Sequence, residues 1–164
     1  MADVTKSKLT DLNTGILKKD ACIVLVKTDW NAAITDQLER GCIAELVKRQ
    51  ASVIVITVPG AVEIPFAIKS YWDHAGKKEK PDAFIALGCV IKGDTPHFEY
   101  VCQLVTDGIG QLNLSLPVPT IFGVLTVNTE EQAMERIGGK HGHKGEEAAL
   151  TALKMISLVE SFKK

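Results

Sequence analysis

Residues 82–91 read DAFIALGCVI, a nearly unbroken apolar run that follows a proline and precedes a polar segment with a glycine. A short continuous run of this kind, without polar alternation, is typical of a strand that is covered on both faces. Three other runs have the same character: 22–27 (CIVLVK), 52–58 (SVIVITV) and 119–126 (PTIFGVLT). The sequence therefore predicts four buried strands.

Segments with helical character separate and follow these strands. They cover residues 34–47, 63–75, 97–114, 130–137 and 144–162. Strands that begin about thirty residues apart match the length of a strand–helix–strand unit. Right-handed crossovers place the helices on both faces of a parallel sheet. We therefore expect one α/β domain over residues 21–164, a three-layer sandwich around a four-stranded parallel sheet.

Residues 1–20 form a polar arm outside this sandwich. Such an arm either frays or adds to the exposed sheet edge of a neighbouring chain. It contains no apolar signal core, and the chain has no apolar run of the roughly 20 residues that a membrane span needs. We expect a cytoplasmic protein without a membrane partner.

The bulk composition is that of an ordinary globular domain. The chain has 164 residues, of which 46% are hydrophobic and 24% charged, and its formal net charge is −1. A near-neutral charge argues against nucleic acid as a partner. Any anion that the protein binds must therefore be held by local groups.

Neither the cysteines nor the histidines form a metal-binding pattern. Cys22, Cys42, Cys89 and Cys102 sit in apolar surroundings without a CxxC pair, which favours buried free thiols over disulfides. His141 and His143 alternate with glycines instead of lying four residues apart on a helix. We expect no metal site.

The loops after the strands are the places to look for chemistry, because open parallel sheets bind ligands beyond the carboxyl ends of their strands. After the first strand, Trp30 is either a stacking platform for a flat heterocycle or a core or interface residue. After the second, Pro59-Gly60 makes a tight turn. Glu63 then either caps a helix or accepts hydrogen bonds from a polyol or amine.

The third and fourth loops carry the charged candidates. Gly93-Asp94-Thr95 opens a helix, whose free amides and hydroxyl form an anion site. His97 follows in the first turn beside Lys92, a position that favours a catalytic over a structural role. After the fourth strand, Arg136 and Lys144 are either anion ligands or solvated charges.

Four motifs in order carry a resemblance to a known family. They are TDWN at 28–31, VPGAVEIP at 58–65, GCVIKGDTPHFEY at 88–100 and PTIFGVLTVNTEEQA at 119–133, followed by ERxGGKxGxKG at 135–145. Together they resemble the lumazine synthases, from about residue 20 to the C-terminus. The resemblance implies a flavodoxin-like fold and no metal or organic cofactor. It also implies condensation of 5-amino-6-(D-ribitylamino)uracil with 3,4-dihydroxy-2-butanone 4-phosphate to 6,7-dimethyl-8-ribityllumazine, the penultimate step of riboflavin biosynthesis, with release of phosphate and water.

The resemblance also implies a set of substrate contacts. They are Trp30, Asn31, Ala61, Val62, Glu63, Val90, Ile91, Lys92, Gly93, Asp94, Thr95, Phe122, Arg136 and Lys144. By this resemblance, Trp30 stacks on the pyrimidine, residues 61–63 line the ribityl chain and the backbone of residues 90–91 meets the uracil edge. Residues 93–95 hold the phosphate.

Other positions of the family pattern concern catalysis and the neighbouring subunit. His97 corresponds to the general acid/base, and Glu147 falls at the position of its acidic partner. Phe122 and Arg136 come from the adjacent subunit, and Lys144 approaches the ribityl or phosphate end. Two positions depart from the pattern: Asp29 stands where many members have Arg, and Glu147 stands where Asp is frequent.

The family assembles as pentamers, some of which pack into a 60-subunit shell. The short turn over residues 138–145 and the absence of proline before residue 59 favour the shell. The resemblance also makes riboflavin synthase a candidate partner.

Two other functions compete with synthesis of lumazine. A cysteine hydrolase with Cys89 and His97 is disfavoured, because no glycine follows two residues after the cysteine as a nucleophile elbow requires. A non-catalytic flavin- or lumazine-binding shell protein is the other alternative. The intact His97, Arg136 and Lys144 argue against it.

Overall fold

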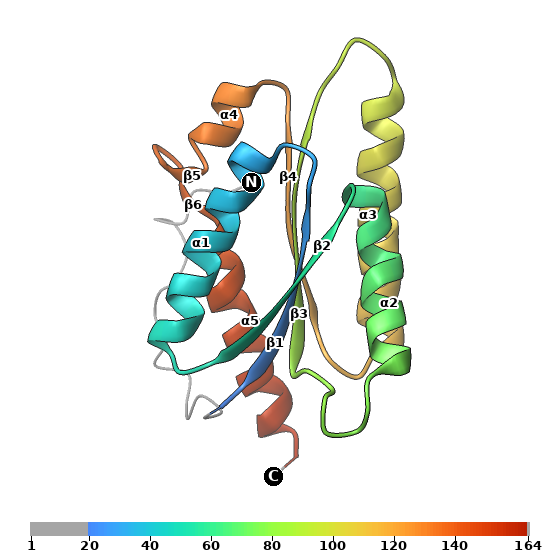
Figure 1. Cartoon of the computed structure of the whole chain (residues 1–164), viewed down its shortest axis with the longest axis vertical. Helices are drawn as coiled ribbons and strands as arrows, with labels where there is room; N and C mark the ends of the chain where they lie inside the picture. Colours follow the sequence, from blue (N-terminus) through green and yellow to red (C-terminus); the bar gives the residue numbers. More distant parts are fainter. Residues whose placement is uncertain (1–19, 164) are drawn as a thin grey trace.

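A computed structural model describes residues 20–163 as a three-layer α/β sandwich (Figure 1). Its central layer is a four-stranded parallel sheet in the order β2-β1-β3-β4. The strands are β1 (Cys22–Thr28), β2 (Ser52–Val58), β3 (Ala83–Ile91) and β4 (Thr120–Val127). The predicted fold and the positions of the four strands are therefore confirmed. The expectation that all four are buried is wrong for β2, which forms an edge of the sheet and is mostly exposed or half-buried. The predicted arm over residues 1–20 lies outside the described residues, except for residue 20.

Two helices cover each face of the sheet (Figure 1). On one face lie α1 (Ala32–Lys48) and α5 (Lys144–Ser161), and on the other lie α2 (Ile64–His74) and α3 (His97–Ser115). Each face has its own apolar core because successive side chains of a strand point to opposite faces. Ile85 and Leu87 enter the first core, whereas Phe84 and Ala86 enter the second, and all four are fully buried. This burial on both faces explains the continuous apolar run of β3.

Helices α1 and α5 meet at a seam that only glycine fits. A Cβ atom on Gly145 would lie 2.0 Å from the carbonyl oxygen of Leu38, and one on Gly41 would lie 2.1 Å from the imidazole of His143. His143 in turn caps α5, where its Nδ1 accepts a hydrogen bond of 3.4 Å from the Glu146 amide. The first turn of α5 is therefore pressed directly against the backbone of α1.

The segment after β4 differs from the prediction. The predicted helix over residues 130–137 is shorter, because α4 covers only Glu130–Met134. A small hairpin of β5 (Ile137–Gly139) and β6 (Gly142–His143) follows in place of the predicted turn. Gly138 and Gly142 adopt φ of 111° and 75°, a region that other residues rarely enter. Backbone freedom at these glycines lets the chain reverse within the hairpin.

The prediction of four buried free thiols holds only in part. All four cysteines are free, but only Cys42 and Cys89 are buried, while Cys22 and Cys102 are half-buried. Residues 20–163 contain no group of three side chains that could hold a metal ion. No helix in this part of the chain combines the length and apolar character needed to cross a bilayer.

Candidate functional site

A cavity of about 450 Å³ opens at the carboxyl edge of the sheet, where β1 and β2 end beside β3 and α3 begins. Its size suits a small-molecule ligand. The lining residues are Trp30, Asn31, Gly60, Ala61, Val62, Glu63, Cys89, Val90, Ile91, Gly93, Thr95, His97, Phe98 and Val101. The loops after the first three strands thus converge as the strand-end rule predicts.

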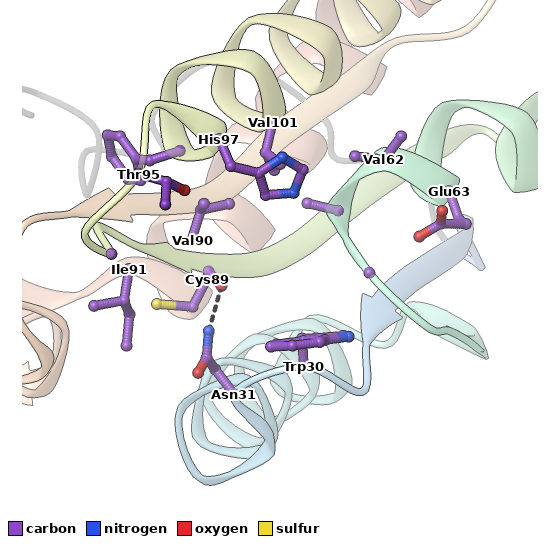
Figure 2. A pocket seen from close by; sticks show the side chains of 14 residues that line it. Trp30, Asn31, Val62, Glu63, Cys89, Val90, Ile91, Thr95, His97 and Val101 are labelled. Carbon is purple, nitrogen blue, oxygen red and sulfur yellow. Dashed lines mark hydrogen bonds between the residues drawn. The ribbon is translucent and has the colours of Figure 1, made fainter.

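Trp30 and His97 face each other across this pocket. Figure 2 shows the indole on one side and the imidazole on the other, with Cys89 and Val90 of β3 between them. The Trp30 side chain is 73% exposed, although indoles are usually well covered. A flat ring stacked on the indole would remove this apolar surface from water.

The backbone around Trp30 is firmly held although its ring is free. The Trp30 amide donates to the Pro59 carbonyl at 3.1 Å, and the Trp30 carbonyl accepts from the Thr28 hydroxyl at 3.2 Å. The Asp29 amide donates to the Val58 carbonyl at 2.9 Å. The two amide bonds join the end of β1 to the end of β2, and the Thr28 bond closes the turn after β1.

The end of β3 presents backbone groups to the pocket. The amides of Phe84 and Lys92 donate toward β4, to the carbonyls of Pro119 and Val127. Backbone direction alternates along a strand, so the N–H and C=O of Ile91 point to the opposite side. There β1 has already ended, because its pairing with β3 stops at Lys27 opposite Leu87. Ile91 can therefore offer a donor and an acceptor to the edge of a heterocycle.

The loop after β2 brings a carboxylate close to the indole. Residues Ala61–Glu63 form a short 3₁₀ turn, named η2, that leads into α2. A Cβ atom on Gly60 would lie 3.0 Å from Oε2 of Glu63 and 3.7 Å from Cδ1 of Trp30. Glycine at this position thus keeps open the space between the stacking ring and a hydrogen-bond acceptor.

The start of α3 forms the remaining wall. Gly93 and Thr95 line the cavity just before α3, which begins at His97 as predicted. Lys92 lies outside the lining and its ammonium is 3.7 Å from the Glu99 carboxylate, in an exposed pair of little energetic weight. His97 is exposed, so its imidazole is open to a bound substrate and to solvent protons.

Cys89 lines the pocket but is unsuited to nucleophilic attack. Burial, with a smaller contribution from the Glu130 carboxylate, raises the pKa of the Cys89 thiol to about 12. The thiolate is the nucleophilic form, and it is scarcely populated at neutral pH with such a pKa. This argues against the cysteine hydrolase.

Besides Lys92, five predicted residues are outside the lining of this cavity: Asp94, Phe122, Arg136, Lys144 and Glu147. Phe122 is on β4 with 41% of its side chain exposed, and the Arg136 guanidinium donates to the Gln132 carbonyl at 2.6 Å. Lys144 is 4% exposed, and its ammonium donates to both carboxylate oxygens of Glu147 at 2.6 and 2.7 Å. The Lys144 amide also donates to the Arg136 carbonyl at 2.8 Å, which ties these residues together.

Four lining residues were not among the predicted contacts: Gly60, Cys89, Phe98 and Val101. Val101 lies one helical turn after His97, so the helical period could have identified it. Gly60 and Cys89 belong to motifs already singled out. Their place in the wall depends on how neighbouring strand ends meet.

Comparison with known proteins identifies relatives along most of the chain. A family model described as 6,7-dimethyl-8-ribityllumazine synthase matches residues 20–160. A 6,7-dimethyl-8-ribityllumazine synthase from Porphyromonas gingivalis is 50% identical over 143 residues, which are 85% of this chain and 86% of the relative. Proteins with the same name from Bacteroides fragilis and Campylobacter lari are 46% and 42% identical, and the matches cover 97% and 94% of those relatives.

Proposed function

Because this chain belongs to the 6,7-dimethyl-8-ribityllumazine synthase family, we propose that its pocket holds both substrates of that reaction next to each other. The chain is an enzyme of riboflavin biosynthesis, a transferase that forms 6,7-dimethyl-8-ribityllumazine. The alternative of a non-catalytic binding protein is not favoured. The observation that carries the proposal is the shared pocket of Trp30 and His97.

5-Amino-6-(D-ribitylamino)uracil occupies the side of the pocket near Trp30. Its ring stacks on the exposed indole, and its uracil edge pairs with the backbone of Ile91, next to Val90, whose own backbone faces β4. The ribityl chain runs along Ala61 and Val62 toward Glu63, whose carboxylate accepts hydrogen bonds from the hydroxyl groups. The nearness of Glu63 to the indole supports this direction.

3,4-Dihydroxy-2-butanone 4-phosphate lies at the start of α3. Its phosphate rests on the segment Gly93, Asp94 and Thr95, where backbone amides and a hydroxyl serve as donors. Lys92 beside them contributes positive charge. The ketone then lies close to the aromatic amine of the first substrate and to His97.

His97 moves the protons of the reaction. The amine attacks the ketone to form an imine with loss of water, phosphate then leaves, and ring closure releases a second water. Each step removes a proton from one atom and returns one to another, which suits an imidazole because it can both accept and donate a proton. Holding two reactive molecules together replaces a bimolecular encounter and supplies most of the acceleration.

The active enzyme is a homo-oligomer with sites between subunits. Phe122 closes the ring pocket of a neighbour, and Arg136 pairs with the phosphate bound there. Lys144 lies toward the ribityl or phosphate end of that site, and Glu147 is the candidate partner of the neighbour's His97. Exposed apolar side chains on α2 and α3, such as Phe66, Tyr100 and Leu114, support such an interface.

The size of the assembly is a separate proposal. We expect pentamers that pack into a 60-subunit shell in the cytoplasm, with riboflavin synthase as a candidate partner. Strand β2 lies at an edge of the sheet with Ile54 and Val55 exposed, which would suit pairing with an arm from another chain. Light scattering of the purified protein tests this, and a particle of pentamer mass excludes the shell.

The activity is tested by mixing the protein with the two substrates and following the fluorescence of the lumazine product. We expect product to form at a rate proportional to the amount of protein. The His97→Ala variant and a no-protein reaction serve as controls, because the two substrates also react slowly by themselves. A protein that binds the substrates without accelerating product formation contradicts the proposal.

A further inference from the structure

Asn31 adopts an unusual backbone conformation directly after Trp30. Its φ and ψ are 59° and 43°, in the left-handed region that asparagine tolerates better than most residues. It occupies the cap position of α1, but its side chain does not cap the helix. Instead the side-chain amide crosses to β3, where Nδ2 donates to the Cys89 carbonyl at 2.8 Å (Figure 2).

This bond replaces a missing backbone hydrogen bond between β1 and β3. If β1 continued in the same register, the Trp30 amide would be the next donor to the Cys89 carbonyl. The Trp30 amide instead donates to Pro59, because the chain turns toward β2. The Asn31 side chain donates to the Cys89 carbonyl in place of the Trp30 amide. The carbonyl therefore keeps a hydrogen-bond partner although the chain has turned away.

The same bond gives Trp30 its third point of attachment. The Pro59 and Thr28 bonds fix Trp30 to β2 and β1. Among the hydrogen bonds of residues 20–163, only the Asn31 bond fixes this loop to β3, which forms the pocket floor. The indole itself is 73% exposed and is therefore not held by packing. Its place over the floor depends on the backbone that carries it.

We propose that Asn31 is a positioning residue that holds the Trp30 indole over the end of β3 by bonding the Cys89 carbonyl. The effect on catalysis rests on the proposed stacking of the aminouracil on Trp30. Loss of the bond frees the loop and weakens binding of the aminouracil, whereas the butanone phosphate, at the start of α3, is unaffected.

The test uses the full-length protein with Trp72→Phe, which leaves Trp30 as the single tryptophan of a chain that has two. Asn31→Asp keeps the size and the tolerance for the left-handed backbone, but an ionised carboxylate cannot donate to Cys89. We expect lower fluorescence anisotropy of Trp30 without ligand. We also expect a roughly tenfold higher KM for the aminouracil, with kcat and the other KM nearly unchanged.

Rescue by acid separates the hydrogen bond from other effects. Once protonated, the carboxyl group introduced by Asn31→Asp is again a donor, so the anisotropy of this variant should recover as the pH is lowered toward about 4. Asn31→Gly keeps the left-handed backbone without any side chain, so its low anisotropy should not recover. The glycine variant also decides the matter if the aspartate variant does not fold.

Asn113→Asp is the matched control. Asn113 makes a similar tether, from Nδ2 to the Thr120 carbonyl at 2.9 Å, but it joins α3 to β4 away from the pocket. It should leave Trp30 anisotropy and both KM values unchanged.

Unchanged anisotropy in the Asn31 variants overturns the proposal, and a raised KM would then mean that Asn31 contacts the substrate directly. Lower anisotropy with an unchanged KM overturns it as well. If the parent protein makes no lumazine but the Asn31 variants still show lower anisotropy, the proposed function is wrong while the structural role of the Asn31–Cys89 bond is supported.

Discussion

At the scale of single residues, we propose His97 as the group on which proton transfer depends. We expect His97→Ala to lower kcat by roughly 100-fold, because a positioned acid/base commonly contributes at least this much. The remaining activity should stay above the uncatalysed rate, since the pocket still holds the two substrates together. Initial rates of lumazine formation at saturating substrate measure the effect.

Binding of a non-reacting aminouracil analogue, followed by Trp30 quenching, is the control for His97→Ala and should change little. A folded variant that binds both substrates but gives no acceleration at all would show that positioning contributes less than we propose.

Cys89 is the second residue with a distinct prediction. Its thiol lines the pocket, but burial raises its pKa to about 12, so it carries no nucleophile at pH 7. We expect Cys89→Ala to keep kcat within about threefold of the parent, with a modest loss of stability from the small cavity. Steady-state rates and urea unfolding measure these two quantities. If a folded variant has no turnover, the thiol is a catalytic group after all.

At the scale of secondary-structure elements, a charged cluster joins β1 to α1. The Lys27 ammonium lies 2.6 Å from carboxylate oxygens of both Asp36 and Glu39, with 14% of its side chain exposed. Burial works against this charge, but the hydrogen bonds to Asp36 and Glu39 leave the pKa of Lys27 above its usual value. The hydrogen bond from Lys27, followed by its charge, lowers the pKa of the Asp36 carboxyl.

This lowered pKa predicts how stability depends on pH. A carboxyl whose pKa is lower in the folded protein stabilises the fold above its ordinary value of 3.8 and loses that effect as the pH falls through the folded value. The difference in urea midpoint between the parent and Asp36→Asn should therefore be largest near pH 7 and shrink below about pH 4. A difference that stays constant over this range would contradict the pairing.

The elements also show what a sequence can and cannot predict. The strands were predictable because β1 and β3 are buried on both faces, which requires continuous apolar runs. The β5–β6 hairpin was not, since its strands have only three and two residues and are rich in glycine. The strand-end rule located the pocket, but the bond from Asn31 to Cys89 joins residues 58 positions apart and follows no periodic pattern.

At the scale of the whole molecule, the division of the site between subunits is the point to test. In the proposed assembly, the position of Phe122 and Arg136 relative to a pocket depends on a second chain, which no pattern within one sequence encodes. Mixing refolded His97→Ala and Arg136→Ala subunits in equal amounts should restore activity. Roughly a quarter of the sites would then combine an intact His97 with an intact Arg136 from the neighbour.

The controls for mixing are the two variants refolded separately, each of which should stay weakly active. The mixed particles must be shown by mass to contain both variants. If their activity does not rise, either His97 and Arg136 act in the site of the same subunit or they do not act in a common site.

The glycine seam between α1 and α5 has a consequence for motion. Because Gly145 rests on the Leu38 carbonyl, the two helices have no room to slide past each other. Amide protons along this contact should exchange with deuterated water together and late, after those of the short α4 and its hairpin. Helices α1 and α5 would then behave as one rigid unit, with the Trp30 loop at the start of α1 and Lys144 at the start of α5.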